Sequence, residues 1–104
     1  MCAAAALLAG GCGGESGASA PAAVRVQVAG FRFLPERATV KAGGTVTWIN
    51  RDKAPHTATR DDGFDTHRLG QGESGPVTLD EPGTYTYYCT FHRFMTATVV
   101  VVEE

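Results

Sequence analysis

The sequence predicts an all-β protein, an antiparallel Greek-key β-sandwich of about eight strands, from three observations. Short segments alternate between apolar and polar residues, as strands with one buried face do. Turn-forming residues separate these segments, and no apolar pattern of helical period is sustained along residues 24–104. The length of 104 residues allows one domain.

The first half of this domain is predicted to be built from short strands. Residues 24–28 alternate with a period of two, and Gly30 separates them from a short strand at residues 31–33. Residues 38–40 lead into a Lys-Ala-Gly-Gly turn, after which residues 45–50 alternate again. A polar loop follows over residues 50–55.

The second half begins with a short predicted strand at residues 56–59, a turn at 61–63 and a partly extended segment at 64–69. A strand at 75–79 ends in an Asp-Glu-Pro-Gly turn, and strands at 84–90 and 96–102 complete the set. In the strand at 84–90, the period of two places Tyr85, Tyr87 and Cys89 on one face. Cys89 is therefore expected to point into the core, with Trp48, Val99 and Val101 as neighbours.

The N-terminal segment is predicted to be separate from the domain. Residues 1–11 carry no charge and contain an apolar run too short to span a bilayer, so they resemble a truncated or atypical export signal. The Ala-Gly-Gly before Cys12 resembles a bacterial lipobox, which makes Cys12 a candidate lipid anchor; an incidental cysteine is the alternative. Residues 12–23 have the composition of a flexible linker, and residues 24–104 form the domain. We therefore expect an exported protein of the bacterial periplasm or cell envelope.

Charge and cysteine content argue against several classes of protein. The net charge of −2 lacks the basic excess typical of nucleic-acid binding. Three cysteines do not suggest a disulfide framework, since Cys2 and Cys12 lie in the leader and only Cys89 lies in the domain. A solitary thiol in an exported protein is prone to oxidation unless it is buried or bound to a metal.

The segment from Cys89 to Met95 combines a thiolate, an imidazole and a thioether at two successive three-residue steps, with His92 between the two sulfurs. Alone, a buried cysteine is usually a small apolar residue. Together with His56, these side chains form the set of two histidines, one cysteine and a weak axial methionine that is typical of a blue-copper electron-transfer site. The remaining histidine, His67, has no such neighbours and is expected at the surface.

Three motifs resemble the plastocyanin-like cupredoxins: Pro-His-Thr at 55–57, the run from Glu81 to Cys89, and the Cys-x-x-His-x-x-Met loop. The short loop is most similar to the amicyanin branch. The resemblance implies a cupredoxin-like sandwich with one type 1 copper ion at one end, and it assigns Tyr85 to the family's tyrosine corner, with its hydroxyl bonded to loop backbone. The implied copper ligands are His56, Cys89, His92 and Met95.

The sequence departs from the amicyanin pattern at two places. Amicyanins typically have prolines on both sides of the loop histidine, where this chain has Phe91 and Arg93. The residue after the first histidine is often asparagine and is here Thr57. We expect Thr57 and Thr90 to connect the two ligand segments, because hydrogen bonds around a metal site orient its ligands.

The resemblance implies a one-electron shuttle between Cu(I) and Cu(II), with no catalytic residues. His92 is the expected exposed edge for electron transfer, and a redox partner is expected to dock around it on Phe91, Arg93 and Phe94. That partner, a cytochrome, dehydrogenase or oxidase, would bind the monomer transiently. Arg93 would favour an acidic partner surface; a plain solvated arginine is the alternative. Tyr88 resembles the residue that plastocyanins use as a second docking site.

Other functions agree less well with the sequence. A copper-binding or copper-delivery protein with the same ligands is the main alternative, and rapid copper exchange would distinguish it. A zinc site would use the cysteine and the histidines but not Met95. An enzyme with a nucleophilic Cys–His pair is disfavoured by the inward direction of Cys89. A binuclear copper centre would need a second loop cysteine, and a multicopper oxidase or nitrite reductase would need more chain.

Overall fold

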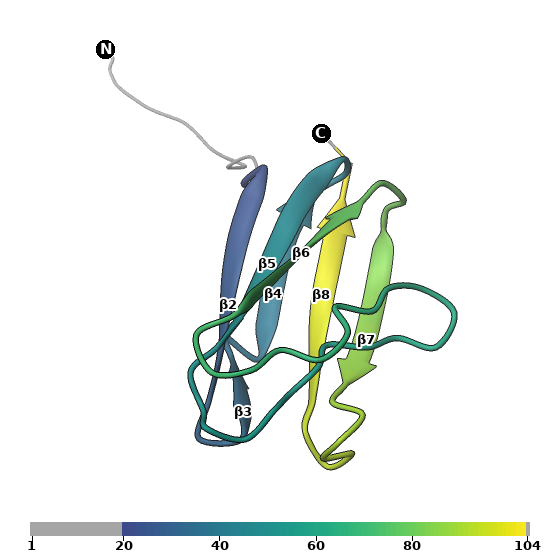
Figure 1. Cartoon of the computed structure of the whole chain (residues 1–104). Helices are drawn as coiled ribbons and strands as arrows, with labels where there is room; N and C mark the ends of the chain where they lie inside the picture. Colours follow the sequence, from purple (N-terminus) through teal and green to yellow (C-terminus); the bar gives the residue numbers. More distant parts are fainter. Residues whose placement is uncertain (1–19, 104) are drawn as a thin grey trace.

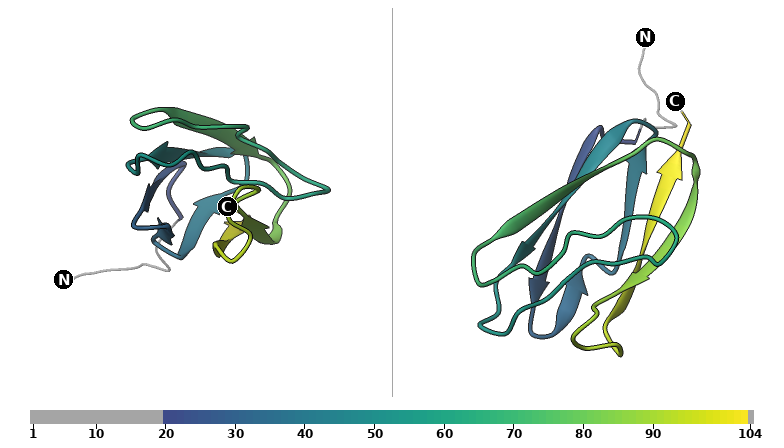
Figure 2. Two further views of the ribbon diagram at one scale, coloured as in Figure 1. Left: turned by 60° about the horizontal axis from the view of Figure 1, so that its bottom comes forward. Right: turned by 45° about the vertical axis from the view of Figure 1, so that its right-hand side comes forward.

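The computed structural model describes residues 20–103, and these form a two-layer β-sandwich (Figure 1, Figure 2). One sheet has four strands in the order β3-β2-β5-β6, and the other has three in the order β4-β8-β7. The strands are β2 Ala23–Ala29, β3 Arg32–Leu34, β4 Arg37–Lys41, β5 Gly44–Asn50, β6 Ser74–Leu79, β7 Gly83–Tyr88 and β8 Thr96–Val102. Within this part of the chain, no helix is long and apolar enough to cross a membrane.

The predicted all-β sandwich is confirmed, with differences in strand direction and in the segment at residues 56–59. The pairs β2–β5 and β4–β8 are parallel, whereas β2–β3, β5–β6 and β7–β8 are antiparallel. An alternating pattern reports which face is buried but not the direction of the neighbouring strand. Residues 56–59, predicted as a strand, form isolated bridges from His56 to Leu69 and from Thr59 to Asp65 and Tyr88.

The core lies between the two sheets, where alternate apolar residues of facing strands meet. The predicted core residues Trp48, Val99 and Val101 are buried in it. The Trp48 indole N–H donates a hydrogen bond to the Tyr87 hydroxyl at 3.1 Å, which satisfies a buried donor. Phe64 stacks on Trp48 with ring centroids 5.3 Å apart. Burial raises the pKa of Tyr87 against the opposing effect of the Trp48 hydrogen bond.

The chain joins the sandwich slightly before the predicted start of the domain at Val24. The carbonyls of Pro21 and Ala22 accept hydrogen bonds from the backbone N–H groups of Lys41 and Thr45. These two residues, predicted as linker, therefore contact the fold directly. The predicted export signal at 1–11, the candidate lipid anchor Cys12 and the linker up to residue 19 lie outside the described residues.

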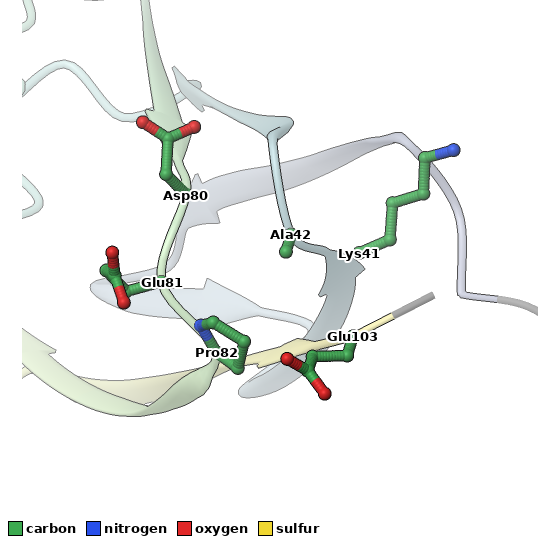
Figure 3. A pocket seen from close by; sticks show the side chains of 6 residues that line it. All are labelled: Lys41, Ala42, Asp80, Glu81, Pro82 and Glu103. Carbon is green, nitrogen blue, oxygen red and sulfur yellow. The ribbon is translucent and has the colours of Figure 1, made fainter.

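The two ends of the sandwich differ in their chemistry. The turn between β2 and β3 and the connection between β7 and β8 lie at the lower end in Figure 1. At the opposite end, a hollow is lined by Lys41, Ala42, Asp80, Glu81, Pro82 and Glu103 (Figure 3). Figure 3 shows its lysine amine and its carboxylates pointing in different directions.

Candidate metal centre

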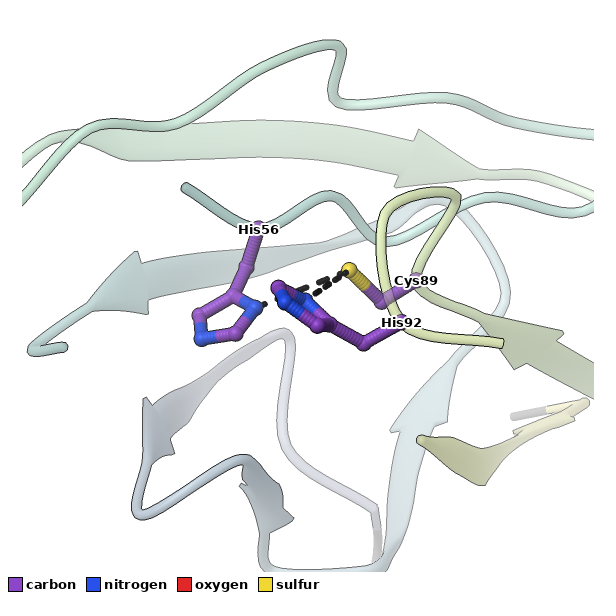
Figure 4. A group of neighbouring side chains, drawn as sticks. All are labelled: His56, Cys89 and His92. Carbon is purple, nitrogen blue, oxygen red and sulfur yellow. Dashed lines mark hydrogen bonds between the residues drawn. The ribbon is translucent and has the colours of Figure 1, made fainter. Parts of the chain in front are cut away.

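Three donor side chains from two connections meet at the lower end of the sandwich (Figure 4). His56 Nδ1 lies 3.6 Å from Cys89 Sγ, and His92 Nδ1 lies 3.8 Å from the same sulfur. The three donor atoms all lie within 4.8 Å of one another. Metal–sulfur bonds of about 2.3 Å and metal–nitrogen bonds of about 2.0–2.1 Å, as for zinc, separate such donors by about 3.6–3.8 Å at tetrahedral to trigonal angles. These side chains therefore suit a single metal ion.

The chemistry of the donors agrees with copper. A thiolate with two imidazoles is the trigonal set of blue-copper sites, in which a distant methionine sulfur is the weak axial ligand. Cys89 is free and, like His56, fully buried, whereas His92 is only partly buried. The centre is thus closed to water on the His56 side and reaches the surface at His92.

Asp52 fixes the orientation of His56. The second ring nitrogen of His56, Nε2, lies 2.9 Å from Asp52 Oδ2, which leaves Nδ1 to face the sulfur. Metal-binding histidines commonly bond a carboxylate in this way, which fixes the tautomer and the ring orientation. The Asp52 carboxylate also accepts hydrogen bonds from the N–H groups of Gly30 and Phe31, at 2.8 and 2.9 Å. Partial burial would raise the pKa of Asp52, but these hydrogen bonds and His56 outweigh burial and lower it.

The two threonines connect the ligand segments. The backbone N–H of Thr57 donates to Cys89 Sγ at 3.4 Å, and the backbone N–H of Thr90 donates to Thr57 Oγ1 at 2.9 Å. The two hydroxyl oxygens lie 3.2 Å apart. Thr57 and Thr90 therefore make the predicted contact between the two ligand segments.

Residues 89–95, the ligand loop, close on themselves through backbone hydrogen bonds. The N–H of Cys89 donates to the carbonyl of Met95 at 3.1 Å, His92 to Cys89 at 3.3 Å, and Met95 to His92 at 2.9 Å. Strand β7 ends at Tyr88, earlier than the predicted residue 90, so Cys89 opens the loop and still points inward. Met95 is buried at the other end of the loop, and the axial role of its sulfur stays a prediction.

The residues predicted to dock a partner are exposed around His92. Phe91 and Phe94 are 49% and 73% exposed, and Arg93 between them is also exposed. The Arg93 guanidinium lies over the Tyr88 ring, 4.7 Å from its centroid. The Tyr88 hydroxyl donates to Asp61, which raises the pKa of Tyr88. The remaining histidine, His67, lies at the surface, as predicted.

Sequence reasoning missed two residues that contact the donor set, Asp52 and Phe31. A signal for Asp52 was present, since a carboxylate four residues before a candidate ligand in a polar loop can reach its ring. The Phe31 ring lies edge-on to both His56 and His92, with centroid distances of 5.1 and 4.9 Å. No local pattern indicates this contact, because it joins residues far apart in the sequence.

A two-layer sandwich with a buried thiol between two imidazoles at one end defines a cupredoxin. Residues 20–102 match the copper-binding proteins of the plastocyanin/azurin family, and the chain belongs to this family. It is 33% identical to the amicyanin of Paracoccus versutus in an alignment of 85 positions, which covers 76% of this chain and only 64% of that protein. It is 36% identical to amicyanin-alpha of Methylorubrum extorquens over 94 residues, covering 84% of this chain and 79% of that one.

Solved structures show the same relationship. A reduced Cu(I) form of an amicyanin variant at pH 4 superposes with a TM-score of 0.72 and 34% identity, covering 80% of this chain and 85% of the amicyanin. The copper-containing nitrite reductase of Thermus scotoductus superposes with a TM-score of 0.73 and 32% identity over 84% of this chain. That match covers only 24% of the reductase, so the likeness extends to one part of the enzyme.

Proposed function

We propose that the protein is a one-electron carrier with a single type 1 copper ion held by His56, Cys89, His92 and Met95. The observation that carries this proposal is the buried Cys89 thiol, which has an imidazole nitrogen on either side at 3.6 and 3.8 Å in a chain of a copper-binding family. Bound copper supplies the Cu(I)/Cu(II) couple. The chain supplies donors that are already in place.

The proposed ligands have different roles in binding copper and in electron transfer. Cys89 provides the thiolate, whose negative charge is stabilised by the N–H of Thr57. His56 is fully buried and held by Asp52, so it anchors the site and excludes water. His92 is partly exposed among Phe91, Arg93 and Phe94, and its ring edge is the path for electrons.

The proposed partner is a redox protein, a cytochrome, dehydrogenase or oxidase, that docks transiently on this apolar rim. Encounters between electron-transfer proteins are typically small and weak, which suits a surface of a few exposed rings. The charge of Arg93 would favour an acidic partner surface. The proposal also includes a monomer exported to the periplasm or cell envelope and anchored through Cys12; the apolar leader and the lipobox-like sequence support this location.

Copper delivery with the same ligands is the second candidate, and the partial exposure of His92 favours it. A carrier and a delivery protein differ in how fast copper leaves the site. Transfer of copper from the loaded protein to a chelator, measured beside electron transfer to a small cytochrome, separates the two. Fast electron transfer with slow copper release supports the carrier, and the reverse supports delivery.

Addition of Cu(II) to the full chain is expected to produce an intense blue thiolate-to-copper band. The Cys89→Ser variant is expected to lose the band because the thiolate is its origin, and His92→Ala is expected to weaken or shift it. The matched control is His67→Ala, which removes a histidine whose side chain is 84% exposed and should leave the band unchanged. A colourless wild-type protein, or a band that survives in Cys89→Ser, would contradict the proposal.

A further inference from the structure

We propose that Phe31 is a positioning residue for His92, and that Asp52 holds Phe31 in place. This inference rests on the proposed function, because it concerns the same copper site. Phe31 lies in the turn between β2 and β3, far in sequence from both histidines. Its ring nevertheless contacts both of them.

The Phe31 ring makes T-shaped contacts with both imidazole rings. Its plane makes an angle of 86° with the ring of His56 and 85° with the ring of His92, at centroid distances of 5.1 and 4.9 Å. The two imidazoles lie 5.0 Å apart at 62°. Edge-to-face contact is a favourable arrangement for aromatic rings. The three rings therefore form one cluster, in which Phe31 contacts His56 and His92 at the same time.

The backbone at Phe31 has an unusual conformation that burial does not explain. Its φ of 59° lies in the left-handed region, which is uncommon for a bulky residue, and its side chain is 41% exposed. Such conformations persist where surrounding contacts impose them, often at functional sites. Here the contacts come from Asp52. Its carboxylate accepts hydrogen bonds from the N–H groups of Gly30 and Phe31 and also contacts Nε2 of His56.

His92 needs such support more than His56 does. The ring of His56 is held by Asp52 at Nε2, whereas within the described residues the hydrogen-bond partner of the His92 ring is Cys89 Sγ. Rotation of His92 is then limited by ring packing from Phe31 at 4.9 Å and His56 at 5.0 Å, and more distantly from Phe94 at 6.2 Å. A ligand that is already oriented loses less rotational freedom when it binds, which raises affinity.

The metal-free full chain tests the positioning role without copper. NMR of its histidine ring protons is expected to show the His92 signals shifted and broadened in Phe31→Leu, and close to wild type in Phe31→Tyr, which keeps an aromatic ring. The Asp52→Ala variant is expected to move the same His92 signals, because it releases the turn that carries Phe31. Leu34→Ala is the matched control, since Leu34 is 40% exposed on the adjacent strand.

Copper binding gives the second measurement. Competition with a chromogenic chelator is expected to show Cu(I) affinity about three- to tenfold weaker in Phe31→Leu, the effect of freeing one side chain, and unchanged in Leu34→Ala. The proposal would be overturned if Phe31→Leu left both the His92 signals and the Cu(I) affinity unchanged. It would also be overturned if Asp52→Ala left the His92 signals unchanged. A missing blue band in the wild-type protein would instead count against the proposed function and leave the metal-free result standing.

Discussion

Asp52 contacts two separate parts of the candidate metal centre, the His56 ring and the turn between β2 and β3. Its carboxylate contacts Nε2 of the buried His56 and accepts hydrogen bonds from two backbone N–H groups of the turn between β2 and β3. These bonds stabilise the ionised carboxylate, so its pKa falls although partial burial opposes this. A single side chain thereby joins the connection that carries His56 to the first turn of the sandwich.

Asp52 is expected to stabilise the metal-free fold at neutral pH and to lose this contribution in acid. Because the folded pKa lies below the unfolded value of 3.8, the contribution is complete above that value and disappears as pH falls through the folded pKa. Urea unfolding of Asp52→Asn is expected to show a lower free energy of unfolding than wild type at about pH 7, with the difference shrinking below about pH 4. Asp62→Asn, at an exposed carboxylate, is the control, and a difference independent of pH would contradict the assignment.

At the scale of elements, Tyr85 closes the connection between β6 and β7. Its hydroxyl donates to the carbonyl of Glu81 at 2.6 Å, so the expected tyrosine corner is present. This corner lies at the end of β7 opposite the ligand loop. Its role is therefore to stabilise the scaffold.

Tyr85→Phe is expected to lower the free energy of unfolding by about 0.5–1.5 kcal/mol, the usual net contribution of one hydrogen bond. Denaturant unfolding of the metal-free protein measures this loss. The blue band of the copper-loaded variant is expected to match wild type, because the hydroxyl removed lies at the far end of the strand. A shifted band would show that the corner also shapes the copper site.

The parts predictable from the sequence are those carried by short-range patterns. Alternation located the strands and directed Cys89 inward, and one short loop contained most of the candidate donors. Strand direction was not predictable, because parallel and antiparallel neighbours impose the same alternation. Residues 56–59 were predicted as a strand from their composition, but they pair with other segments only at isolated bridges. Phe31 was missed because its contacts are made only when the turn packs against the two ligand segments.

At the scale of the whole molecule, the donors lie on two connections, one joining strands of each sheet. His56 lies in the connection between β5 and β6 of the four-stranded sheet, whereas Cys89 and His92 lie between β7 and β8 of the three-stranded sheet. A metal bound to all three therefore ties the two layers together. Separation of the layers on unfolding would destroy the binding site.

Copper is therefore expected to raise the stability of the whole domain by linkage. At free copper about 100-fold above the dissociation constant, the gain is about 2.7 kcal/mol if only the folded state binds. Thermal unfolding with Cu(I), and again after removal by a chelator, measures this gain. The stabilisation by copper should vanish in Cys89→Ser and persist in His67→Ala. Equal stabilisation of both variants would show that copper binds at a site other than Cys89.

The closed backbone of the ligand loop has a consequence for how such a protein diversifies. The loop's hydrogen bonds run between Cys89, His92 and Met95, and its ends enter strands that pair at Tyr88 and Thr96. The side chains of Phe91 and Arg93, on either side of His92, take no part in these bonds and are exposed. Mutation can therefore change these two residues of the proposed docking surface while the donors keep their places. The proposed docking surface and the candidate metal ligands therefore lie on the same short segment, yet they can change separately in evolution.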